Sequence, residues 1–563
     1  PGRAGEWRVT SWTLGLGGSD HDFSAALMLD GDVRVAIEQE RLSRIRYGET
    51  LWFKDPLILP ADYCLSAEGI ALDDVARIVG TDTLPARVRA GWRGRSVTLF
   101  PHHLAHAASA YLMLPPGVRA GIIVYDGYGS VRRDVEAPGW AARETVSLFV
   151  FEGRQWRRIG GAFGQSRTED DDFPLAVSNS IGMFYEAVTQ VLGYGAFDSG
   201  KTMGLAAVGQ PRHVEELERF VRYGAEPESC FECDAGSEEF LKAVEAVLAK
   251  PGPGFRAKAD LAASAQAVVE RALAHFAAFF SEIPLDLIAV SGGCGLNSVA
   301  NGRLAASSAA AGRPVFIPPH CGDAGLAFGA LWLSRSEQSG TGPLTFRGFP
   351  ADPALARPGR CYSREEAREA AAAFYPRLVP DHSISSAADL AEVLAEGAVC
   401  GLFNGPSEFG PRALGGRSLL ADPRRVAVRE RINRRIKHRE PFRPLAPMVL
   451  RSRFDAYFAD RPPADAFMLT VVEATARCRR EAPAAVHADG TARVQIVDDE
   501  TGDPFLVGLL RSFEQRTGTG ILINTSFNRR GEPIVETPMD AVDAFLGLEL
   551  DGLFLDGVFF RRA

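Results

Sequence analysis

The chain has 563 residues, of which 46% are hydrophobic and 24% are charged, and its net charge at pH 7 is −9. This is the composition of an ordered globular protein of two to four domains, and the acidic balance disfavours a nucleic-acid binder, which needs excess Lys and Arg. No apolar run is long enough to span a bilayer, and residues 1–7 lack the basic and apolar regions of a signal peptide. We therefore expect no nucleic-acid or membrane partner and a cytoplasmic location.

Residues 1–335 show the pattern of an α/β domain. Strand-like apolar runs precede glycine-rich turns, and a long helical pattern covers residues 259–280. The expected strands are residues 12–17, 24–29, 120–125, 287–290 and 315–317. We predict a first domain over residues 1–345.

Three turns in this domain combine glycines with polar residues directly after an expected strand. They are Leu14–Ser19, Val124–Ser130 and Val290–Ser298. Glycine lets the backbone turn its N–H groups toward a phosphate, and a following helix adds a favourable dipole. One such turn alone is usually a tight β-turn, but three together predict a nucleotide site. Its candidate residues are Gly127, Gly129, Gly292, Gly293 and Asn297.

Two further side chains are expected near that nucleotide. His21 follows the first turn and could act as general base toward a hydroxyl, or could simply cap the loop. The segment Asp198–Ala206 has the composition of a loop and contains one of the chain's few lysines, Lys201, between glycines. Lys201 either lines the nucleotide or acceptor cleft or is a solvated turn residue.

Four residues form a candidate metal site. His102 and His106 are four residues apart in an expected helix ending near Leu112, so their imidazoles share one face. Asp126 and Asp323 follow expected strands and could complete the ligand set; the alternative is a hydrogen-bonded pair of histidines without a metal. Nitrogen and oxygen ligands together suit one divalent ion, with iron(II), manganese and zinc all open.

A Gly/Pro-rich stretch at residues 339–358 separates a second α/β unit, predicted over residues 346–563. Its expected helices are residues 387–396 and 426–436, and its expected strands are residues 399–403, 467–472, 493–497 and 520–524. Proline-stiffened loops in this unit present basic side chains, and strand ends present Ser and Asn donors, which suits a small phosphorylated ligand. These residues are Arg412, Lys437, Arg443, Arg493, Asn524, Ser526 and Asn528.

Seven motifs follow one another along nearly the whole chain: H-H-L-A-H-A, K-T-M-G-L-A, S-G-G-C-G-L-N, C-G-D-A-G, G-P-S-E-F-G-P-R-A-L-G, I-K-H-R-E-P-F-R-P-L-A-P and N-T-S-F-N. On these motifs the chain resembles the NodU/CmcH family of carbamoyltransferases. The resemblance implies an actin-like, metal-dependent ATPase domain, similar to that of the tRNA threonylcarbamoyl-transfer protein, followed by a YrdC-like α/β domain.

The resemblance also implies roles for the candidate residues. An iron-like metal is expected on His102, His106, Asp126 and Asp323. Carbamoyl phosphate is expected on Arg412, Lys437, Arg443, Ser526 and Asn528, with Arg493 and Asn524 near the adenylate. The expected catalytic residues are His21 at the acceptor, Lys201, and Arg46, which stands where related enzymes carry lysine.

The function implied is ATP-dependent O-carbamoyl transfer. Carbamoyl phosphate and ATP, with Mg²⁺, would give carbamoyl-adenylate, and the carbamoyl group would pass to a hydroxyl of a small-molecule acceptor, expected to be a natural product. Three alternatives remain: hydrogenase-maturation carbamoyl transfer, tRNA modification and a non-catalytic nucleotide sensor. The lone pair Cys230 and Cys233 lacks the second C-x-x-C of a zinc ribbon, so reduced thiols are expected there.

Overall fold

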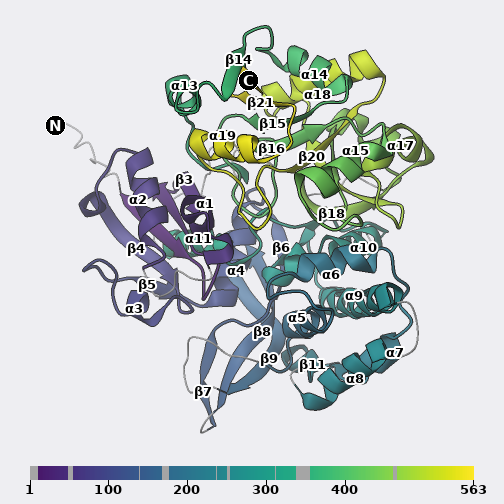
Figure 1. Ribbon diagram of the computed structural model, residues 1–563. Coiled ribbons are helices and arrows are strands. Elements are labelled where there is room, and N and C mark those ends of the chain that lie inside the picture. Colours follow the sequence, from purple (N-terminus) through teal and green to yellow (C-terminus); the bar gives the residue numbers. More distant parts are fainter. Residues whose placement is uncertain are drawn as a thin grey trace, which may run out of the picture.

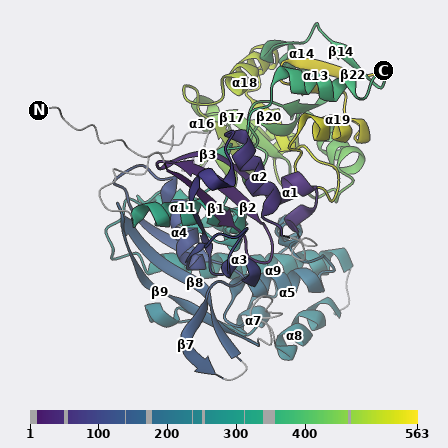
Figure 2. The ribbon, with the colours of Figure 1, turned by 90° about the vertical axis from the view of Figure 1, so that its left-hand side faces the viewer.

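The computed structural model describes residues 11–48, 55–137, 140–167, 177–235, 237–249, 254–310, 312–337, 356–460 and 466–563. The predicted domain boundary at residues 345 and 346 lies outside these ranges, as does most of the Gly/Pro-rich connection. The part of the chain after that connection forms a separate layer of helices and sheet that lies against the first part (Figures 1 and 2).

The first sheet contains five strands in the order β3-β2-β1-β4-β5. Strands β1, β2 and β3 are antiparallel neighbours, whereas β4 and β5 continue from β1 in parallel. Helix α2 (Ile58–Ala67) covers one face and α11 (Leu326–Ser336) the other. The bounds are β1 Trp12–Gly17, β2 Ser24–Leu29, β3 Asp32–Glu38, β4 Val75–Thr81 and β5 Thr98–Phe100.

The second sheet repeats this arrangement. Strands β6 (Arg119–Tyr125), β8 (Trp140–Glu152) and β9 (Gln155–Arg167) are antiparallel neighbours, and β12 (Leu287–Ser291) and β13 (Val315–Phe316) continue from β6 in parallel. Strand β7 (Val131–Ala137) also pairs with β8. Two sheets with the same strand order and the same senses form the duplicated actin-like fold, which confirms the class predicted for the first unit.

Helices gather on one side of β8 and β9 in the view of Figure 1. The longest is α9 (Gly254–Ala278), which confirms the helical pattern at residues 259–280. The others in this region are α5 Ile181–Val191, α7 Val214–Glu218, α8 Glu238–Ala249 and α10 Ser298–Ala310. The short strands β10 (Val221–Tyr223) and β11 (Phe231–Cys233) pair nearby, and Cys230 and Cys233 are buried free thiols.

One sequence-based prediction was wrong. The segment Asp198–Ala206, expected to be a loop, forms helix α6 (Ser199–Ala206). Glycines usually indicate a break in a helix, but Gly204 lies within this one and faces the second unit: a Cβ there would make ordinary contacts, 3.7 Å from the Phe442 ring and 3.8 Å from Arg443 Cδ. Helix α6 therefore packs against the loop that presents Arg443.

The C-terminal unit is a nine-stranded mixed sheet in the order β14-β22-β21-β15-β16-β20-β17-β19-β18. Helices α14 (Ala387–Ala395) and α18 (Pro504–Thr517) cover one face, and α13 (Arg364–Ala372) and α19 (Pro538–Gly547) cover the other. The strands are β14 Leu378–Asp381, β15 Val399–Phe403, β16 Arg417–Ala421, β17 Ala446–Leu450, β18 Phe467–Glu473, β19 Thr491–Val497, β20 Ile521–Ser526, β21 Gly552–Leu555 and β22 Val558–Arg562. This confirms the α/β class of the second unit.

The helical prediction at residues 426–436 divides into two conformations. Residues Val426–Arg431 form α15, and Ile432–Ile436 form a π-helical turn that ends with Lys437 N–H donating to Ile432 O (2.8 Å). Such turns inside helices are often found at functional sites. Here the turn places the ammonium group of Lys437 over the end of β20, where Ser526 lies.

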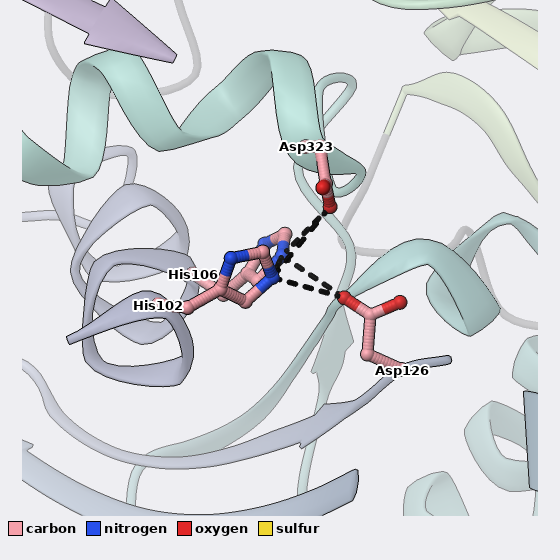
Figure 3. A group of neighbouring side chains, drawn as sticks. All are labelled: His102, His106, Asp126 and Asp323. Carbon is pink, nitrogen blue, oxygen red and sulfur yellow. Dashed lines mark hydrogen bonds and ion pairs between the residues drawn. The ribbon is translucent and has the colours of Figure 1, made fainter. Parts of the chain in front are cut away.

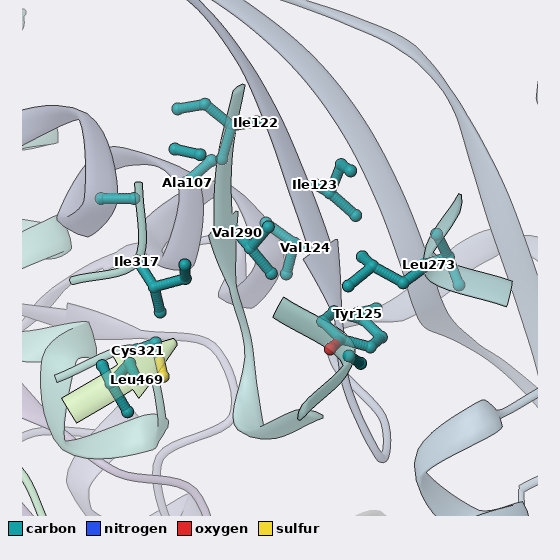
Figure 4. Close-up of a cluster of buried hydrophobic side chains, with 14 of the residues drawn as sticks. Ala107, Ile122, Ile123, Val124, Tyr125, Leu273, Val290, Ile317, Cys321 and Leu469 are labelled. Carbon is teal, nitrogen blue, oxygen red and sulfur yellow. The ribbon is translucent and has the colours of Figure 1, made fainter. Parts of the chain in front are cut away.

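The two units share one apolar cluster. Figure 4 shows Leu469 of β18 beside Ile317 and Cys321, which belong to the turn after β13. Asn301 on α10 donates to Leu469 O (2.8 Å), and a Cβ on Gly302 would clash with Val471. The contact between the units is therefore a packed interior rather than a solvated surface. Among the described residues, no helix is long and apolar enough to cross a membrane.

Candidate functional site

The four predicted metal ligands come together between the two sheets of the first unit (Figure 3). His106 Nε2 lies 3.1 Å from His102 Nε2, 3.1 Å from Asp126 Oδ2 and 3.2 Å from Asp323 Oδ1. His102 Nε2 lies 3.5 Å and 3.7 Å from the same two carboxylate oxygens. All four side chains are buried.

Local structure explains why both imidazoles point the same way. Helix α4 (His102–Leu112) begins directly after Pro101, so His102 and His106 lie one turn apart on one face. His102 N–H donates to Ser130 Oγ (2.7 Å), and Ser130 in turn donates to Asp82 (2.8 Å), which anchors the start of the helix. His102 Nδ1 lies 2.7 Å from Thr83 Oγ1, and this contact orients its ring.

The electrostatics of the group are those of a cation site. Burial lowers the pKa of His106, but hydrogen bonds to Asp126 and Asp323 outweigh it and raise that pKa to about 9. Burial raises the pKa of Asp323, but His102 and His106 outweigh it and bring it to about 2, and the pKa of Asp126 falls well below its usual value for the same reason. The carboxylates are therefore ionised, and positive charge is favoured between them.

The donor set fits one divalent ion. Ligand atoms about 2.1 Å from a metal lie about 3–3.5 Å apart, and the separations above lie close to that range. Two ring nitrogens facing each other at 3.1 Å cannot both carry a proton, so at most one of these two nitrogens is protonated in the metal-free protein, and a metal would replace that proton. His103 is equally buried, but its Nδ1 lies 2.8 Å from Ser147 Oγ, outside the set.

A metal and a proton compete for His106, because an imidazole binds a metal only when the nitrogen is unprotonated. With a pKa of about 9 in the metal-free protein, we expect the affinity for a divalent metal to increase about tenfold per pH unit between about pH 7 and about pH 9 and then to level off. Competition with a fluorescent chelator at three pH values measures this. An affinity that is the same at each pH would contradict the assignment.

The predicted nucleotide loops surround the same carboxylates. Gly127 N–H donates to Asp126 Oδ1 (2.7 Å), and a Cβ on Gly293 would lie 2.9 Å from that oxygen. Gly292 has φ +92° and leaves no room for a Cβ beside Tyr125 O, so only glycine is accommodated there. Glycine at these turns therefore lets the main chain pack closely on Tyr125 and Asp126, beside the metal ligands, whereas the amide of Asn297 is paired with Gln266.

His21 lies beside this group, between two carboxylates. Its Nε2 is 3.6 Å from Asp20 and its Nδ1 is 3.2 Å from Asp22, and its side chain is 23% exposed. Burial lowers its pKa, but Asp20, Asp22 and Asp323 outweigh burial and raise it well above the usual value. Its ring also contacts Phe197 at 4.5 Å between centroids. The imidazole therefore holds a proton more firmly than a free histidine does, at a partly open position.

Arg46 and Lys201 take different positions. Arg46 lies over the Tyr47 ring at 4.5 Å, on the side that faces the second unit. Lys201, on α6, is paired with Asp198 (2.6 Å). Both lie near the Arg443 loop, because α6 packs on that loop and Arg46 lowers the pKa of Arg443. The proposed roles of both remain predictions.

In the second unit, the predicted anion-binding residues form one group around Lys437. Its Nζ donates to Ser526 O (2.6 Å) and to Asn528 Oδ1 (2.7 Å), and Ser526 Oγ donates to the same Asn528 oxygen (2.6 Å). Burial and neighbouring arginines hold the pKa of Lys437 well below its usual value. This ammonium therefore lies in a strongly positive environment.

The arginines around it are also buried and repel one another. Burial first, and then the positive charge of neighbouring arginines, lower the pKa of Arg412 to about 10 and that of Arg439 to about 9, and those of Arg443 and Arg493 fall likewise. Among the described residues, Nε of Arg412 and Nε of Arg493 are buried without a hydrogen-bond partner. An anion would supply both the missing partners and the missing negative charge.

Asn524 joins two parts of this cluster. Its Nδ2 donates to Ala413 O (3.0 Å), next to Arg412, and to Gln495 Oε1 (2.6 Å), two residues from Arg493 on β19. Its Oδ1 is buried without a partner among the described residues. Asn524 therefore fixes the arginine-bearing loop relative to the strand and offers one unused acceptor.

Sequence analysis missed Arg439, although it lies in the basic cluster. Its Nε donates to Asn433 Oδ1 (2.8 Å) in the π-helical turn, and its charge lowers the pKa of Lys437. The signal in the sequence was the spacing: only His438 separates Lys437 from Arg439 in the same loop, and two basic residues so placed can face one anion. The left-handed conformation of His438 between them (φ +46°) marks the same turn.

The fold and these sites define an enzyme of two α/β units, and the family comparisons identify its class. A model described as carbamoyltransferase N-terminus matches residues 81–332, and one described as carbamoyltransferase C-terminus matches residues 391–562. Together they cover most of the chain on both sides of the connection. The chain belongs to the carbamoyltransferase family and is a transferase, so the non-catalytic alternative is not retained.

Relatives are similar over much of their length. Nodulation protein NolNO of Sinorhizobium fredii is 31% identical, over 96% of this chain and 79% of that protein. Nodulation protein NolO of Bradyrhizobium diazoefficiens is 35% identical, over 68% of this chain and 69% of that protein. Among solved structures, full-length HypF in the phosphate- and nucleotide-bound form has 15% identity and a TM-score of 0.39, over 59% of this chain and 56% of that one.

Proposed function

We propose that the chain is an ATP-dependent O-carbamoyltransferase that uses carbamoyl phosphate and acts on a hydroxyl of a small molecule in natural-product biosynthesis. The observation that carries this proposal is the buried basic cluster around Lys437, whose charged neighbours are arginines. Buried charge of one sign is costly unless a counter-ion occupies the site. Two phosphorylated reactants supply that negative charge.

Activation is assigned to the second unit. Carbamoyl phosphate and water would give carbamate and phosphate; a carbamate oxygen would then bond to the α-phosphorus of ATP while the bond to pyrophosphate breaks. The product of this step would be carbamoyl-adenylate. Lys437 and the arginines would hold the phosphates, and Ser526 and Asn528 would orient the Lys437 ammonium group, since both hydrogen-bond with it. Mg²⁺ is expected to accompany ATP.

Transfer is assigned to the first unit. A divalent metal, for which iron(II) is our first candidate, would be held by His102, His106, Asp126 and Asp323 and would supply positive charge beside the nucleotide loops. The glycine-rich backbone would bind the adenylate's phosphate. His21 would take the acceptor hydroxyl's proton as the oxygen bonds to the carbamoyl carbon and AMP leaves.

The direct test uses isotope-labelled carbamoyl phosphate, ATP and a panel of hydroxyl-bearing small molecules, with products read by mass spectrometry. A product heavier than the acceptor by one labelled carbamoyl group, formed together with AMP, supports the proposal. AMP formation that does not depend on carbamoyl phosphate would refute it.

Replacing His21 with Ala should block transfer and leave activation intact. General base catalysis contributes roughly 10²–10⁴-fold, so carbamoylated acceptor should fall by at least about two orders of magnitude. AMP should still form from carbamoyl phosphate and ATP, through slow hydrolysis of the adenylate. His382→Ala, at an exposed histidine of the second unit, is the control and should behave as wild type. Equal loss of AMP formation and of transfer in His21→Ala would place His21 elsewhere in the reaction.

A further inference from the structure

Arg44 belongs to the first unit but hydrogen-bonds with the second. Its Nη1 donates to Ile534 O (2.6 Å) and its Nη2 to Pro533 O (2.8 Å). Its carboxylate neighbours there, Glu532 and Asp540, lie farther away, at 3.7 Å and 3.9 Å. The guanidinium group thus donates hydrogen bonds to two consecutive main-chain carbonyls in the loop that follows β20.

The backbone of Arg44 is unusual for an arginine. It is the C-cap of α1 (Gln39–Ser43) and has φ 61° and ψ 19°, the left-handed conformation in which glycine is normally selected. A non-glycine residue is strained in this conformation, and here its side chain bridges the two units.

The loop that Arg44 holds also fixes a predicted donor-binding residue. Asn528 Nδ2 donates to Glu532 O (2.7 Å), the residue before Pro533, and to Arg529 O (2.9 Å). With its amide nitrogen committed, Asn528 turns its Oδ1 toward Lys437 Nζ, 2.7 Å away. A continuous set of hydrogen bonds and main-chain links therefore joins Arg44 to the ammonium group at the centre of the basic cluster.

We propose that Arg44 is a positioning residue of the activation site, which the first unit thereby completes across the contact between the units. This rests on the function proposed above. Arg44 touches no reacting group. It fixes the position of the loop at Glu532–Ile534, and that loop fixes the orientation of the Asn528 amide. The amide oxygen in turn fixes the position of the Lys437 ammonium group.

A second arginine on the same helix also joins the two units. Arg41 is fully buried; it donates to Gly410 O (2.5 Å) and is paired with Glu38 (2.5 Å). Arg41 contacts the loop before Arg412, whereas Arg44 contacts the loop after Asn528. The two arginines therefore hold different loops of the second unit, so loss of Arg44 leaves the Arg41 contact in place.

The test compares two half-reactions in the full-length chain carrying Arg44→Ala or Arg44→Lys. The control is Arg34→Ala, because Arg34 has a similar exposed fraction (26% against 25%) and pairs with Glu68 within the first unit. We expect Arg44→Ala to reduce kcat/KM for carbamoyl phosphate in AMP formation about 10- to 100-fold. Transfer from supplied carbamoyl-adenylate and the melting temperature should change little. Arg44→Lys, with one ammonium for two carbonyls, should be intermediate.

Two outcomes would overturn the inference. Unchanged kinetic constants for carbamoyl phosphate in Arg44→Ala would show that the loop does not need the arginine. An equal loss in transfer from supplied adenylate, or a loss that follows a lowered melting temperature, would make Arg44 a docking residue only. A wild-type chain that forms no AMP from carbamoyl phosphate and ATP would instead refute the proposed function itself.

Discussion

Replacing Lys437 with Ala should abolish formation of AMP from carbamoyl phosphate and ATP. The Nζ of Lys437 is held by Ser526 and Asn528 at the centre of the basic cluster, so its loss removes the point charge that the proposed mechanism uses to bind the donor's phosphate. Loss of a charged group that contacts a phosphate costs roughly 2–5 kcal/mol, which corresponds to a rate reduced by about 30- to 5,000-fold. Carbamoylation of the acceptor should fall equally, since no adenylate is made.

The same variant should transfer normally when carbamoyl-adenylate is supplied, because transfer is assigned to the first unit. Lys258→Ala is a matched control: Lys258 Nζ donates to Leu192 O (2.9 Å), within the first unit and outside the cluster. Product formed from carbamoyl phosphate and ATP at the wild-type rate, or failure of the supplied adenylate to rescue, would contradict the division of labour between the two units.

Replacing His106 with Ala should remove the bound metal and with it the transfer activity. His106 Nε2 contacts both carboxylates of the group. Its loss leaves three ligand residues and removes the imidazole that pairs with the two buried carboxylates. We expect metal content, measured by plasma mass spectrometry, to fall from about one per chain to near zero, and transfer to fall by at least about 10³-fold.

The neighbouring residue provides the control for this experiment. His103 is equally buried on the same helix but bonds to Ser147 instead of joining the group. His103→Gln should therefore keep the metal, even if it lowers the melting temperature. Equal metal content in wild type and His106→Ala would refute the assignment of the metal site.

Much of the first unit could be predicted from the sequence, because its signals are local. An i, i+4 pair of histidines in a helical pattern forces both rings to one side, and His102 and His106 indeed lie together. The strands at residues 12–17 and 24–29 have the predicted bounds, since apolar runs end at glycine turns. Asp126 and Asp323 were expected at such turns and lie beside the histidines.

What could not be predicted depends on packing between distant parts of the chain. Glycines in Ser199–Ala206 indicated a loop, because composition cannot show that Gly204 lies against Phe442. The bond from Arg44 to Ile534 joins residues 490 positions apart, and no local pattern encodes such a pairing. Arg439 was overlooked because a basic residue among many arginines is not distinctive until its burial is known.

The apolar cluster shared by the two units, with Leu469 beside Ile317 and Cys321, also has a kinetic consequence. Because one packed interior joins the units, folding holds the two sites of the proposed mechanism, one for activation and one for transfer, at a fixed separation. Movement of the activated group from one site to the other would then be intramolecular. The effective concentration of that group at the second site would not depend on the concentration of the protein. A labile intermediate in such an arrangement would be exposed to hydrolysis by bulk water only on the path between the two sites.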